Sequence, residues 1–541
     1  MDVHLADTVN RPNRSVVLFF VDGIGKDRFD EALAAGELPN IRKHLHDRGV
    51  RIDDAVAVIP SITYANAVTL ITGRHPGRHA IISNKWYDPK RKRYKNYCLI
   101  NTYRDVDRDY PSTPTIHEIL ADRVTVSLQA AQRRGATHTI DNWVTSGINW
   151  FFGNYTGVDC LVAQDFELIA RRAPRWGTWP EFILAYFPGV DQVGHRHGPK
   201  SDAYRRAIVN VDLQIGRVIQ ALRDAGMYDR TYLCFASDHG MVETSRHFDF
   251  SAFLREQCNG RVWSNDVCND DASARRMLRN HDFALAVSGS RWAAVYALEK
   301  PGSPGPLAPM MAALHSQVAT SSKQSRPSSE ALQSRFPRWV RDAMHHSAVE
   351  LMACSPQPGE VHLFRGDRHA IVTRTASHPY GYALTQRPGS EVVIPDPTQA
   401  AGPELSQSDD RFWLRASSDH RYPDLIPQIM TMFETPRAGD LVFFAAEGWD
   451  FGSGNSRGGH GSILRGDLRV PLLFSGPGLP HGARIDVARL TDVMPTMLGF
   501  LDAAANMHGK PVPLDGVDLL AEFRTDGRAL EVAKNAVRVG S

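Results

Sequence analysis

The sequence lacks any run of about 20 apolar residues, the length that a helix needs to cross a bilayer. Its first apolar run, Val16 to Val21, is too short for the apolar centre of a secretory signal. The preceding residues, Met1 to Arg14, are polar and include Asp2 and Asp7. We therefore expect no membrane span and no secretory signal, which makes a cytoplasmic location the default prediction.

Cysteine and surplus charge are also scarce. Six cysteines are scattered through 541 residues without a Cys-x-x-Cys pair, so we expect free buried thiols rather than a disulfide framework. They are Cys98, Cys160, Cys234, Cys258, Cys268 and Cys354. The 62 basic and 60 acidic residues leave a formal charge of +2, without the basic surplus of a dedicated nucleic-acid binder. Short basic runs such as Arg91-Lys92-Arg93 are expected to be solvated loops.

Four short apolar runs indicate buried strands of a parallel sheet, and polar or turn-forming residues follow each run. They are Ser15 to Val21, Phe182 to Phe187, Thr231 to Ala236 and Val470 to Phe474. Apolar residues at three- and four-residue steps predict an amphipathic helix from Tyr204 to Leu222, with Gly226 as its stop. Strands that alternate with such helices predict an α/β fold whose ligands gather beyond the carboxyl ends of the strands.

This alternation fades between about Arg246 and Asp440. A Ser/Pro/Gln-rich segment (Thr320 to Arg335) and two hairpin strands (Val361 to Leu363 and Ala370 to Thr375) indicate an inserted α+β cap. Core-like sequence returns at Gly439 to Ala446. The predicted division is therefore core at 14–245, cap at 246–438, second part of the core at 439–522 and a peripheral tail at 523–541.

Seven side chains with chemical potential lie at the predicted strand ends or in adjacent loops. They are Asp22, Thr63, Asp191, His195, Asp238, His239 and His460. Carboxylate and imidazole are the ligands expected for zinc-like ions in mixed oxygen and nitrogen sites. A threonine hydroxyl is a poor nucleophile at neutral pH, but coordination to a cation makes it easier to deprotonate. Two such ions can stabilise the attacking and the leaving oxygen of an in-line displacement.

Each of these residues also has a purely structural explanation. Asp22 precedes a glycine, as turn residues often do, and with 22 histidines an Asp238-His239 pair can arise by chance. His460 lies in a Gly-Gly-His-Gly stretch typical of a flexible loop. Thr63 fits a helix cap, because apolar positions follow it and Gly73 ends the run. The positive end of that helix is nevertheless also where a phosphate would bind.

Together, the motifs resemble the alkaline phosphatase superfamily, most closely its type I phosphodiesterase/nucleotide pyrophosphatase branch. The resemblance covers about Val16 to Met241 and Gly439 to Leu501. The segments that carry it are Val21-Asp-Gly23, Pro60-Ser-Ile-Thr-Tyr-Ala-Asn66, Ile82-Ser-Asn84, Tyr186-Phe-Pro-Gly-Val-Asp-Gln-Val-Gly-His195, Ser237-Asp-His-Gly-Met241 and Gly458-Gly-His-Gly-Ser462. It implies an α/β, alkaline phosphatase-like sandwich with a mostly parallel central sheet and an inserted α+β cap.

The resemblance also implies two divalent metal ions, with zinc as the first choice. One ion, beside Thr63, would be held by Asp22, Asp238 and His239, and the other by Asp191, His195 and His460. Asn84 and the backbone N–H near Tyr64 would bind phosphoryl oxygens. Tyr64 and Tyr186 match positions where the family stacks aromatic rings on a nucleobase, although both also suit plain packing.

The implied reaction is hydrolysis of a phosphate ester in two steps, as in a phosphodiesterase or nucleotide pyrophosphatase. Thr63 attacks phosphorus and expels an alcohol or nucleotide, and water then hydrolyses the phospho-threonine. The expected partner is a small-molecule phosphate ester or nucleotide, with no stable nucleic acid complex. Ala65 and Ala67 depart from the family pattern, and Asn149 to Gly153 stands near the place of a missing Trp-Pro-Gly segment, so nucleotide specificity stays open.

Several alternatives remain within the superfamily. A phosphomonoesterase or a phosphonate hydrolase of the phosphonoacetate type would share the metal ligands. The cofactor-independent phosphoglycerate mutases use serine as nucleophile, and sulfatases need a Cys- or Ser-x-Pro-x-Arg site that Thr63 does not offer. A non-catalytic binding protein would be expected to have lost one or more ligands, whereas all six ligand positions and the nucleophile position are filled here.

Overall fold

The structure is a computed structural model that describes residues 5, 8–99, 101–264, 271–300, 305–319, 332–374, 381–386, 394, 411–454 and 456–524. Some predictions fall outside the described residues. These are the ones for most of the first seven residues, for Cys268, for residues 320–331 of the Ser/Pro/Gln-rich segment, for Thr375 and for residues 525–541 of the tail.

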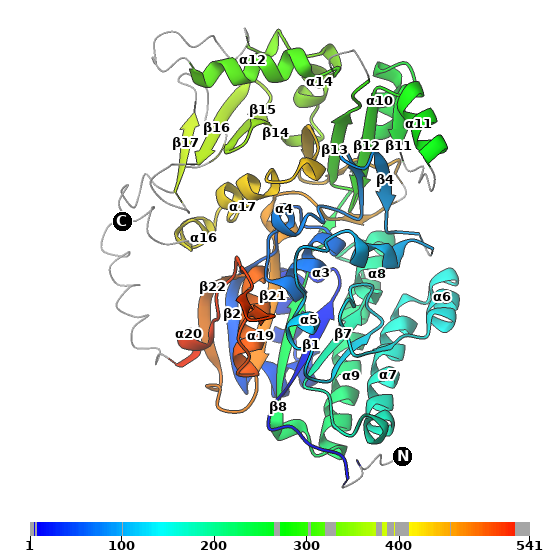
Figure 1. Ribbon diagram of the computed structural model, residues 1–541, viewed down its shortest axis with the longest axis vertical. Coiled ribbons are helices and arrows are strands. Elements are labelled where there is room, and N and C mark those ends of the chain that lie inside the picture. The colour runs from blue at the N-terminus through cyan, green and yellow to red at the C-terminus, as the bar shows by residue number, and fades with distance from the viewer. Residues whose placement is uncertain are drawn as a thin grey trace.

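An eight-stranded, mostly parallel sheet forms the centre of the larger lobe (Figure 1). Its strands in spatial order are β22 (Ala483–Arg489), β2 (Gly49–Val56), β21 (Arg469–Ser475), β8 (Thr231–Ser237), β1 (Ser15–Val21), β7 (Phe182–Phe187), β5 (Thr125–Leu128) and β6 (His138–Ile140). All strand pairs are parallel except those that β21 makes with β2 and β8. The α/β class and the mostly parallel sheet are thereby confirmed.

The direction of β21 corrects one prediction. The run Val470 to Phe474 forms a buried strand, as expected, but it is antiparallel to both of its neighbours. The physical reason is that a strand covered on both faces is apolar throughout whichever way it points. The sequence of β21 therefore predicts that the strand is buried but does not predict its direction.

Strand β1 shows why the sheet is covered on both faces. All seven of its residues are buried, and alternate side chains enter different hydrophobic clusters. Val16, Leu18 and Phe20 join the cluster that includes helix α3 (Thr63–Thr72) and helix α19 (Val493–Phe500). The other side of β1 joins the cluster of helices α1 (Lys26–Ala34), α7 (Tyr155–Trp176) and α9 (Asp202–Asp224).

The long helix on that second face confirms its prediction. Helix α9 (Asp202–Asp224) buries Tyr204, Ile208, Val211, Ile215, Val218, Ile219 and Leu222, and Gly226 follows it with φ of +66°. The remaining principal helices of this lobe are α1 (Lys26–Ala34), α2 (Pro39–Ile41), α4 (Pro76–His79), α5 (Ile116–Ile119), α6 (Trp143–Phe151), α7 (Tyr155–Trp176), α8 (Gly189–His197), α18 (Arg465–Leu468) and α20 (Leu520–Arg524). A short hairpin, β3 (Lys85–Asp88) and β4 (Arg93–Asn96), extends toward the other lobe (Figure 1).

A second eight-stranded sheet, largely antiparallel, forms the smaller lobe. In order its strands are β11 (Val262–Ser264), β12 (Phe283–Ser288), β13 (Trp292–Ala297), β18 (Leu441–Ala445), β14 (Val349–Gln357), β15 (Glu360–Arg365), β16 (Arg368–Arg374) and β17 (Tyr382–Gln386). Helices α10 (Phe250–Gln257), α12 (Ala308–Ala319) and α14 (Arg338–His345) contribute to the cluster on one face. The predicted hairpin of Val361 to Leu363 with Ala370 onward is present as β15 and β16.

Strand β18 departs from the predicted division of the chain. It falls in the range 439–522 that was expected to return to the core, yet it pairs with β13 and β14 in the middle of the second sheet. A fully buried strand such as Leu441 to Ala445 has the same apolar run in either sheet. The chain leaves the cap only after this strand, and the other domain boundaries stay predictions.

The two lobes share hydrophobic packing. One cluster contains Leu18 of the central sheet, Trp292 and Leu351 of the second sheet, and Leu425 of helix α17 (Leu425–Met432). Helix α17 lies between the two sheets (Figure 1). The hydroxyl of Tyr94 in β4 also donates to the carbonyl oxygen of Leu285, 2.9 Å away. The cap is therefore packed onto the core rather than tethered to it.

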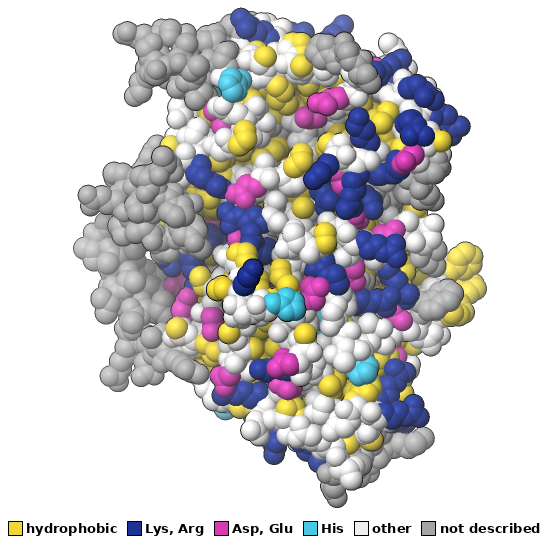
Figure 2. Space-filling view, viewed as in Figure 1, with side chains coloured by type: hydrophobic (Ala, Val, Ile, Leu, Met, Phe, Trp, Pro, Cys, Tyr) yellow, Lys and Arg dark blue, Asp and Glu magenta, His cyan; other side chains and the backbone are white. Residues whose placement is uncertain are grey.

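On the surface, basic and acidic side chains are interspersed on the face that Figure 2 shows. Arg91 pairs with the buried Asp109 and Arg93 pairs with Asp271, so part of the basic run Arg91-Lys92-Arg93 is engaged rather than merely solvated. An apolar patch marks the edge where α6 lies (Figure 2). Its exposed side chains are Val144, Ile148, Trp150, Phe151 and Phe152.

The cysteines within the described part of the chain are unpaired, but only some are buried. Cys234 and Cys354 are buried, whereas Cys98 is exposed and Cys160 and Cys258 are half-buried. The expectation of free thiols therefore holds for these five, and that of general burial does not. Among the described residues, no helix combines the length and the apolar character that crossing a membrane requires.

We predict that Ile215→Ala in α9 lowers the free energy of unfolding by about 2–5 kcal/mol, because it leaves a cavity under the sheet. Ile215 is fully buried, whereas Leu213 on the same helix is 59% exposed. The control Leu213→Ala should change stability by no more than about 0.5 kcal/mol. Urea denaturation monitored by circular dichroism measures both, and equal losses would contradict the assigned buried face of α9.

Candidate metal centre

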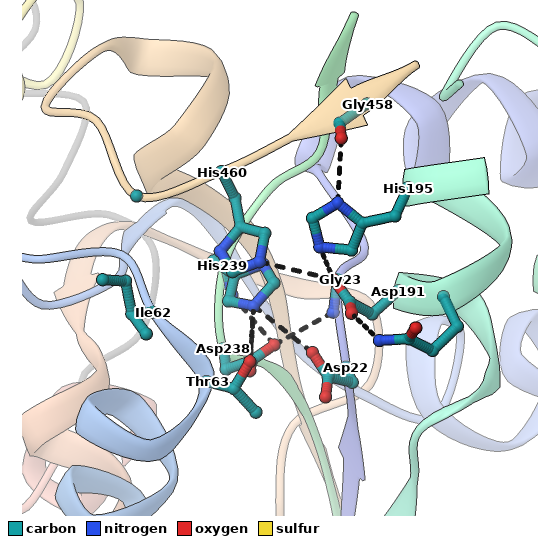
Figure 3. A network of polar contacts seen from close by, with 12 residues as sticks. Asp22, Gly23, Ile62, Thr63, Asp191, His195, Asp238, His239, Gly458 and His460 are labelled. Carbon is teal, nitrogen blue, oxygen red and sulfur yellow. Dashed lines mark hydrogen bonds and ion pairs between the residues drawn. The ribbon is translucent and has the colours of Figure 1, made fainter. Parts of the chain in front are cut away.

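The order of the central strands brings three aspartates together. Strands β8, β1 and β7 are neighbours and run parallel, so the residues after their carboxyl ends meet at one edge of the sheet. Asp22 directly follows β1, Asp238 directly follows β8, and Asp191 lies in the first turn of α8, just beyond β7. All three are buried. Figure 3 shows them close to one another.

The first group of potential ligands consists of Asp22, Asp238 and His239. The imidazole Nε2 of His239 lies 3.3 Å from Asp22 Oδ1 and 3.3 Å from Asp238 Oδ2. Asp238 is oriented by its other oxygen, which accepts hydrogen bonds from the backbone N–H of Gly23 and of His239, each 3.0 Å long. Its Oδ2 is thereby turned toward the imidazole.

The second group consists of Asp191, His195 and His460. Asp191 and His195 lie one turn apart in α8, and His460 comes from a loop far along the sequence. Asp191 Oδ1 is 3.4 Å from His195 Nε2 and 3.6 Å from His460 Nε2. The ring of His460 stacks on that of His239 with centroids 3.5 Å apart, so the two groups are adjacent (Figure 3).

All three histidines present the same nitrogen to the centre. Each Nδ1 donates to a backbone carbonyl oxygen: His195 to Gly458 at 2.8 Å, His239 to Gly240 at 3.0 Å and His460 to Ser61 at 2.9 Å. A carbonyl only accepts, so the proton is held on Nδ1 and the lone pair of Nε2 points into the site. This is the arrangement by which outer contacts fix the tautomer of a metal-binding histidine.

The carboxylates offer an independent test of whether a cation fits. Asp22 Oδ1, Asp191 Oδ1 and Asp238 Oδ2 are buried and accept no hydrogen bond from the described part of the chain. They are the same oxygens that face the Nε2 atoms. Acceptors buried against one another are unfavourable unless a proton or a cation lies among them. The donor set therefore suits two adjacent divalent cations.

The electrostatics agree with this interpretation. Burial raises the pKa of Asp238 and of Asp191, and the neighbouring charge of Asp22 raises both further. Burial alone lowers the pKa of His239, but the carboxylates of Asp238 and Asp22 raise it to about 10. The first group thus holds positive charge strongly, whether as a proton or as a metal ion.

Thr63 lies beside the first group, at the start of α3. Its Oγ1 is 3.2 Å from His239 Nε2. The prediction that Thr63 caps this helix is wrong by one residue: Ile62 is the N-cap, and Thr63 is the first helical residue. Its hydroxyl is therefore free of the capping role and points at the aspartates and histidines, while the positive end of the helix dipole lies beneath it (Figure 3).

Asn84 and Tyr64 are linked to each other. The backbone N–H of Tyr64 donates to Asn84 Oδ1 over 3.0 Å. The sequence predicted that Asn84 and the N–H near Tyr64 both bind phosphoryl oxygens. In the structure the N–H of Tyr64 already donates to Asn84. The amide NH₂ of Asn84 is the donor that this contact leaves available beside Thr63.

The two tyrosines are held by their hydroxyl groups. Tyr186 donates to Asp22 Oδ2 over 2.5 Å, and Tyr64 donates to the carbonyl oxygens of Tyr97 and Tyr103 over 3.2 and 3.4 Å. Both side chains are half-buried. Their rings are thus fixed in orientation at the edge of the site, and Tyr186 also contacts a potential metal ligand.

Other residues that support the site had no assigned role in the sequence. Gly23 has φ of +75°, and a Cβ there would lie 2.8 Å from the Cα of Asp191. Asn66 accepts from Val58 N–H over 2.8 Å and donates to Ile62 O over 3.1 Å, which fixes the loop before Thr63. Asn66 ends the segment Pro60 to Asn66, so the sequence could have singled it out. The close approach of Gly23 to Asp191 is visible only in the structure.

Comparisons with known proteins agree with the geometry. A family model described as type I phosphodiesterase / nucleotide pyrophosphatase matches residues 16–306. An uncharacterised pyrophosphatase/phosphodiesterase of Schizosaccharomyces pombe is 28% identical over 271 residues, which is 48% of this chain and 49% of that protein. A bis(5′-adenosyl)-triphosphatase of Xenopus laevis is 24% identical over 247 residues, 44% of this chain and 50% of that protein.

Ectonucleotide pyrophosphatase/phosphodiesterase family member 1 of Mus musculus is 26% identical over 243 residues, 42% of this chain and 24% of that protein. The chain thus spans about half the length, or less, of the curated relatives it matches. Among solved structures, murine ectonucleotide pyrophosphatase/phosphodiesterase 5 aligns with a TM-score of 0.49 and 16% identity, over 92% of this chain and 98% of that chain.

We predict that the chain binds two divalent cations. Asp22→Asn should leave one cation bound, because it removes one carboxylate charge from the first group only. Asp53→Asn, on a partly exposed residue paired with Arg484, is the control that should keep both. Elemental analysis of the purified proteins gives the stoichiometry. If the wild type held no metal and a chelator left its Tm unchanged, the interpretation would fail.

We also predict that Asn66→Ala lowers the free energy of unfolding by about 2–4 kcal/mol, because it leaves buried backbone groups without partners. Asn66 is fully buried. The control is Thr72→Ala in the same helix, whose hydroxyl donates to the carbonyl oxygen of Val68 in its own helix, over 2.7 Å. Its cost should be closer to about 1 kcal/mol. Chemical denaturation measures both, and the reverse order would contradict the role of Asn66.

Proposed function

This chain belongs to the type I phosphodiesterase / nucleotide pyrophosphatase family, and from that premise we propose that it hydrolyses phosphate esters through a phospho-threonine at Thr63. The observation that carries the proposal is the position of the Thr63 hydroxyl. Its Oγ1 lies 3.2 Å from His239 Nε2, beside one of the two groups of potential ligands. A nucleophile and a phosphate-binding helix end thus share one place.

The two groups would hold two zinc ions in the proposed enzyme. Asp22, Asp238 and His239 would hold the one beside Thr63, and Asp191, His195 and His460 the other. Mixed carboxylate and imidazole donors with fixed Nε2 lone pairs suit zinc. Such a cation lowers the pKa of a hydroxyl or water bound to it and stabilises charge on phosphoryl oxygens.

The protein's own groups then account for binding and attack. The hydroxyl of Thr63 attacks phosphorus, the alcohol or nucleotide leaves, and water later hydrolyses the phospho-threonine. Asn84 would donate its amide NH₂ to a phosphoryl oxygen, with its orientation held by the N–H of Tyr64. The positive end of α3 adds a favourable field for the phosphate.

A nucleotide is the substrate class that we propose first. Tyr64 and Tyr186 stand at the edge of the site with fixed, half-buried rings that suit stacking on a base. Two relatives named as a nucleotide pyrophosphatase/phosphodiesterase and a bis(5′-adenosyl)-triphosphatase support this class. A phosphomonoester or a phosphonate remains the alternative that the same ligands could serve.

We predict that Thr63→Ala lowers kcat by at least about 10³-fold, because the nucleophile is lost, while Thr63→Ser retains measurable turnover. The assay compares p-nitrophenyl phosphate, bis-p-nitrophenyl phosphate, the p-nitrophenyl ester of thymidine monophosphate and phosphonoacetate. The nucleotide ester should be the best substrate. Thr72→Ala, a buried threonine of the same helix whose hydroxyl donates to Val68, should keep activity near that of the wild type.

Each arm of this experiment tests a separate part of the proposal. Full activity of Thr63→Ala on the best substrate would show that the nucleophile is another group. Faster turnover of the monoester than of either diester would exclude the phosphodiesterase assignment but not the nucleophile. Turnover of phosphonoacetate alone would point to the phosphonate alternative. Loss of activity in Thr72→Ala would indicate damage to the helix rather than to the chemistry.

A further inference from the structure

Arg291, which directly precedes strand β13 of the cap, is a fully buried arginine whose contacts lead to the metal centre. Its Nε donates to Asp467 Oδ1 over 2.9 Å and its Nη2 to Asp467 Oδ2 over 3.3 Å. The remaining N–H groups reach the carbonyl oxygens of Ala445, Ala446 and Trp449. The guanidinium is thus paired with a buried carboxylate and hydrogen-bonded around its edge, as a buried charge requires.

Asp467 carries this contact into the core. Its Oδ1 also accepts from the backbone N–H of Ser462 over 3.1 Å, two residues after His460. Its backbone carbonyl oxygen accepts from the N–H of Gly240 over 2.8 Å, directly after His239. The ion pair between Arg291 and Asp467 is therefore connected to the chain beside two of the potential ligands.

The turn that carries Arg291 also holds His460 directly. The N–H of Arg291 donates to the carbonyl oxygen of His460 over 3.1 Å, and the N–H of His460 donates to the carbonyl oxygen of Gly289 over 2.7 Å. Gly289 has φ of +57°, and a Cβ there would lie 2.4 Å from His460 O and 2.8 Å from ring atoms Cε1 and Nδ1. At Gly289 the backbone of this turn, residues 289–291, is thus packed against the imidazole without room for a side chain.

We propose that the turn 289–291, locked by the ion pair of Arg291 with Asp467, positions His460 for the cation that it would share with Asp191 and His195. The cap is then a structural part of that metal site. Arg291 is a positioning residue, because it contacts His460 only through the backbone and touches no reacting atom. The inference rests on the proposed function, since it needs the two-cation site.

The test is zinc binding by the whole 541-residue chain, measured by competition with a chromophoric chelator. In Arg291→Lys the charge remains but the forked contacts with Asp467 are lost. We expect one of the two zinc affinities to fall about 10- to 100-fold, the range for loss of a residue that orients a ligand, and the other to stay within about twofold. Substitution of a residue that binds zinc directly would instead abolish binding of that ion.

The matched control is Arg134→Lys. Arg134 forms a comparable forked pair, with Glu118, through contacts of 2.9 and 3.0 Å, and its N–H groups also reach the carbonyl oxygens of Asp107, Tyr110 and Thr113. We expect it to lower the Tm, as Arg291→Lys does, but to leave both zinc affinities unchanged. A second variant, Gly289→Ala, keeps Arg291 but places a Cβ against the His460 ring. It should therefore lower the affinity for the same single zinc ion.

The outcomes separate the two proposals. A wild type that binds no zinc would overturn the metal site of the proposed function and, with it, this inference. A wild type with two zinc ions and an Arg291→Lys variant with the same two affinities would overturn the inference alone. If Arg291→Lys does not fold, Gly289→Ala decides: selective loss of one affinity supports the positioning role, and unchanged affinities overturn it.

Discussion

Three aspartates are buried next to one another in this protein, and most of the surrounding contacts orient or neutralise their carboxylates. Asp22, Asp191 and Asp238 each turn one oxygen toward the same small volume without a hydrogen-bond donor from the described residues. Like charges so close together in a poorly solvated place are strongly unfavourable. The high pKa of His239 expresses the same demand for positive charge. A pair of divalent cations satisfies it more completely than one imidazolium can.

The fold meets this demand by topology. Parallel neighbours β8, β1 and β7 deliver the three carboxylates from one edge of one sheet, so their relative positions follow from backbone pairing. The histidines are then tuned by backbone carbonyls, which fix Nδ1 as the donor and aim Nε2 at the carboxylates. Only His460 comes from outside this edge. It is also the ligand that needs contacts from the second sheet.

The sequence predicted those elements whose burial shows in the spacing of nearby residues. The buried run of β1 and the apolar stripe of α9 were readable because burial on two faces or on one face has a characteristic spacing. Asp22 and Asp238 could be singled out because each directly follows a buried strand, whereas Thr63 and His460 were singled out through the resemblance of their motifs to a known family. The direction of β21, the sheet to which β18 belongs and the pairing of Arg291 with Asp467 were not readable, because each depends on a partner distant in the chain. The sequence placed the start of α3 one residue too late. With Ile62 as the N-cap, the hydroxyl of Thr63 does not cap the helix.

The loop before α3 connects features that the sequence keeps apart. The carbonyl oxygen of Ser61 fixes the tautomer of His460, while Thr63, two residues later, lies against His239. The same loop is anchored from the cap side, because Gln428 of α17 accepts from the N–H of Ile59 over 2.7 Å. A displacement of this loop would therefore move the nucleophile and one potential ligand together. Since the loop contacts both lobes, the relative position of the lobes bears on the nucleophile as well as on the metal site, and the cap cannot be regarded as a substrate lid alone.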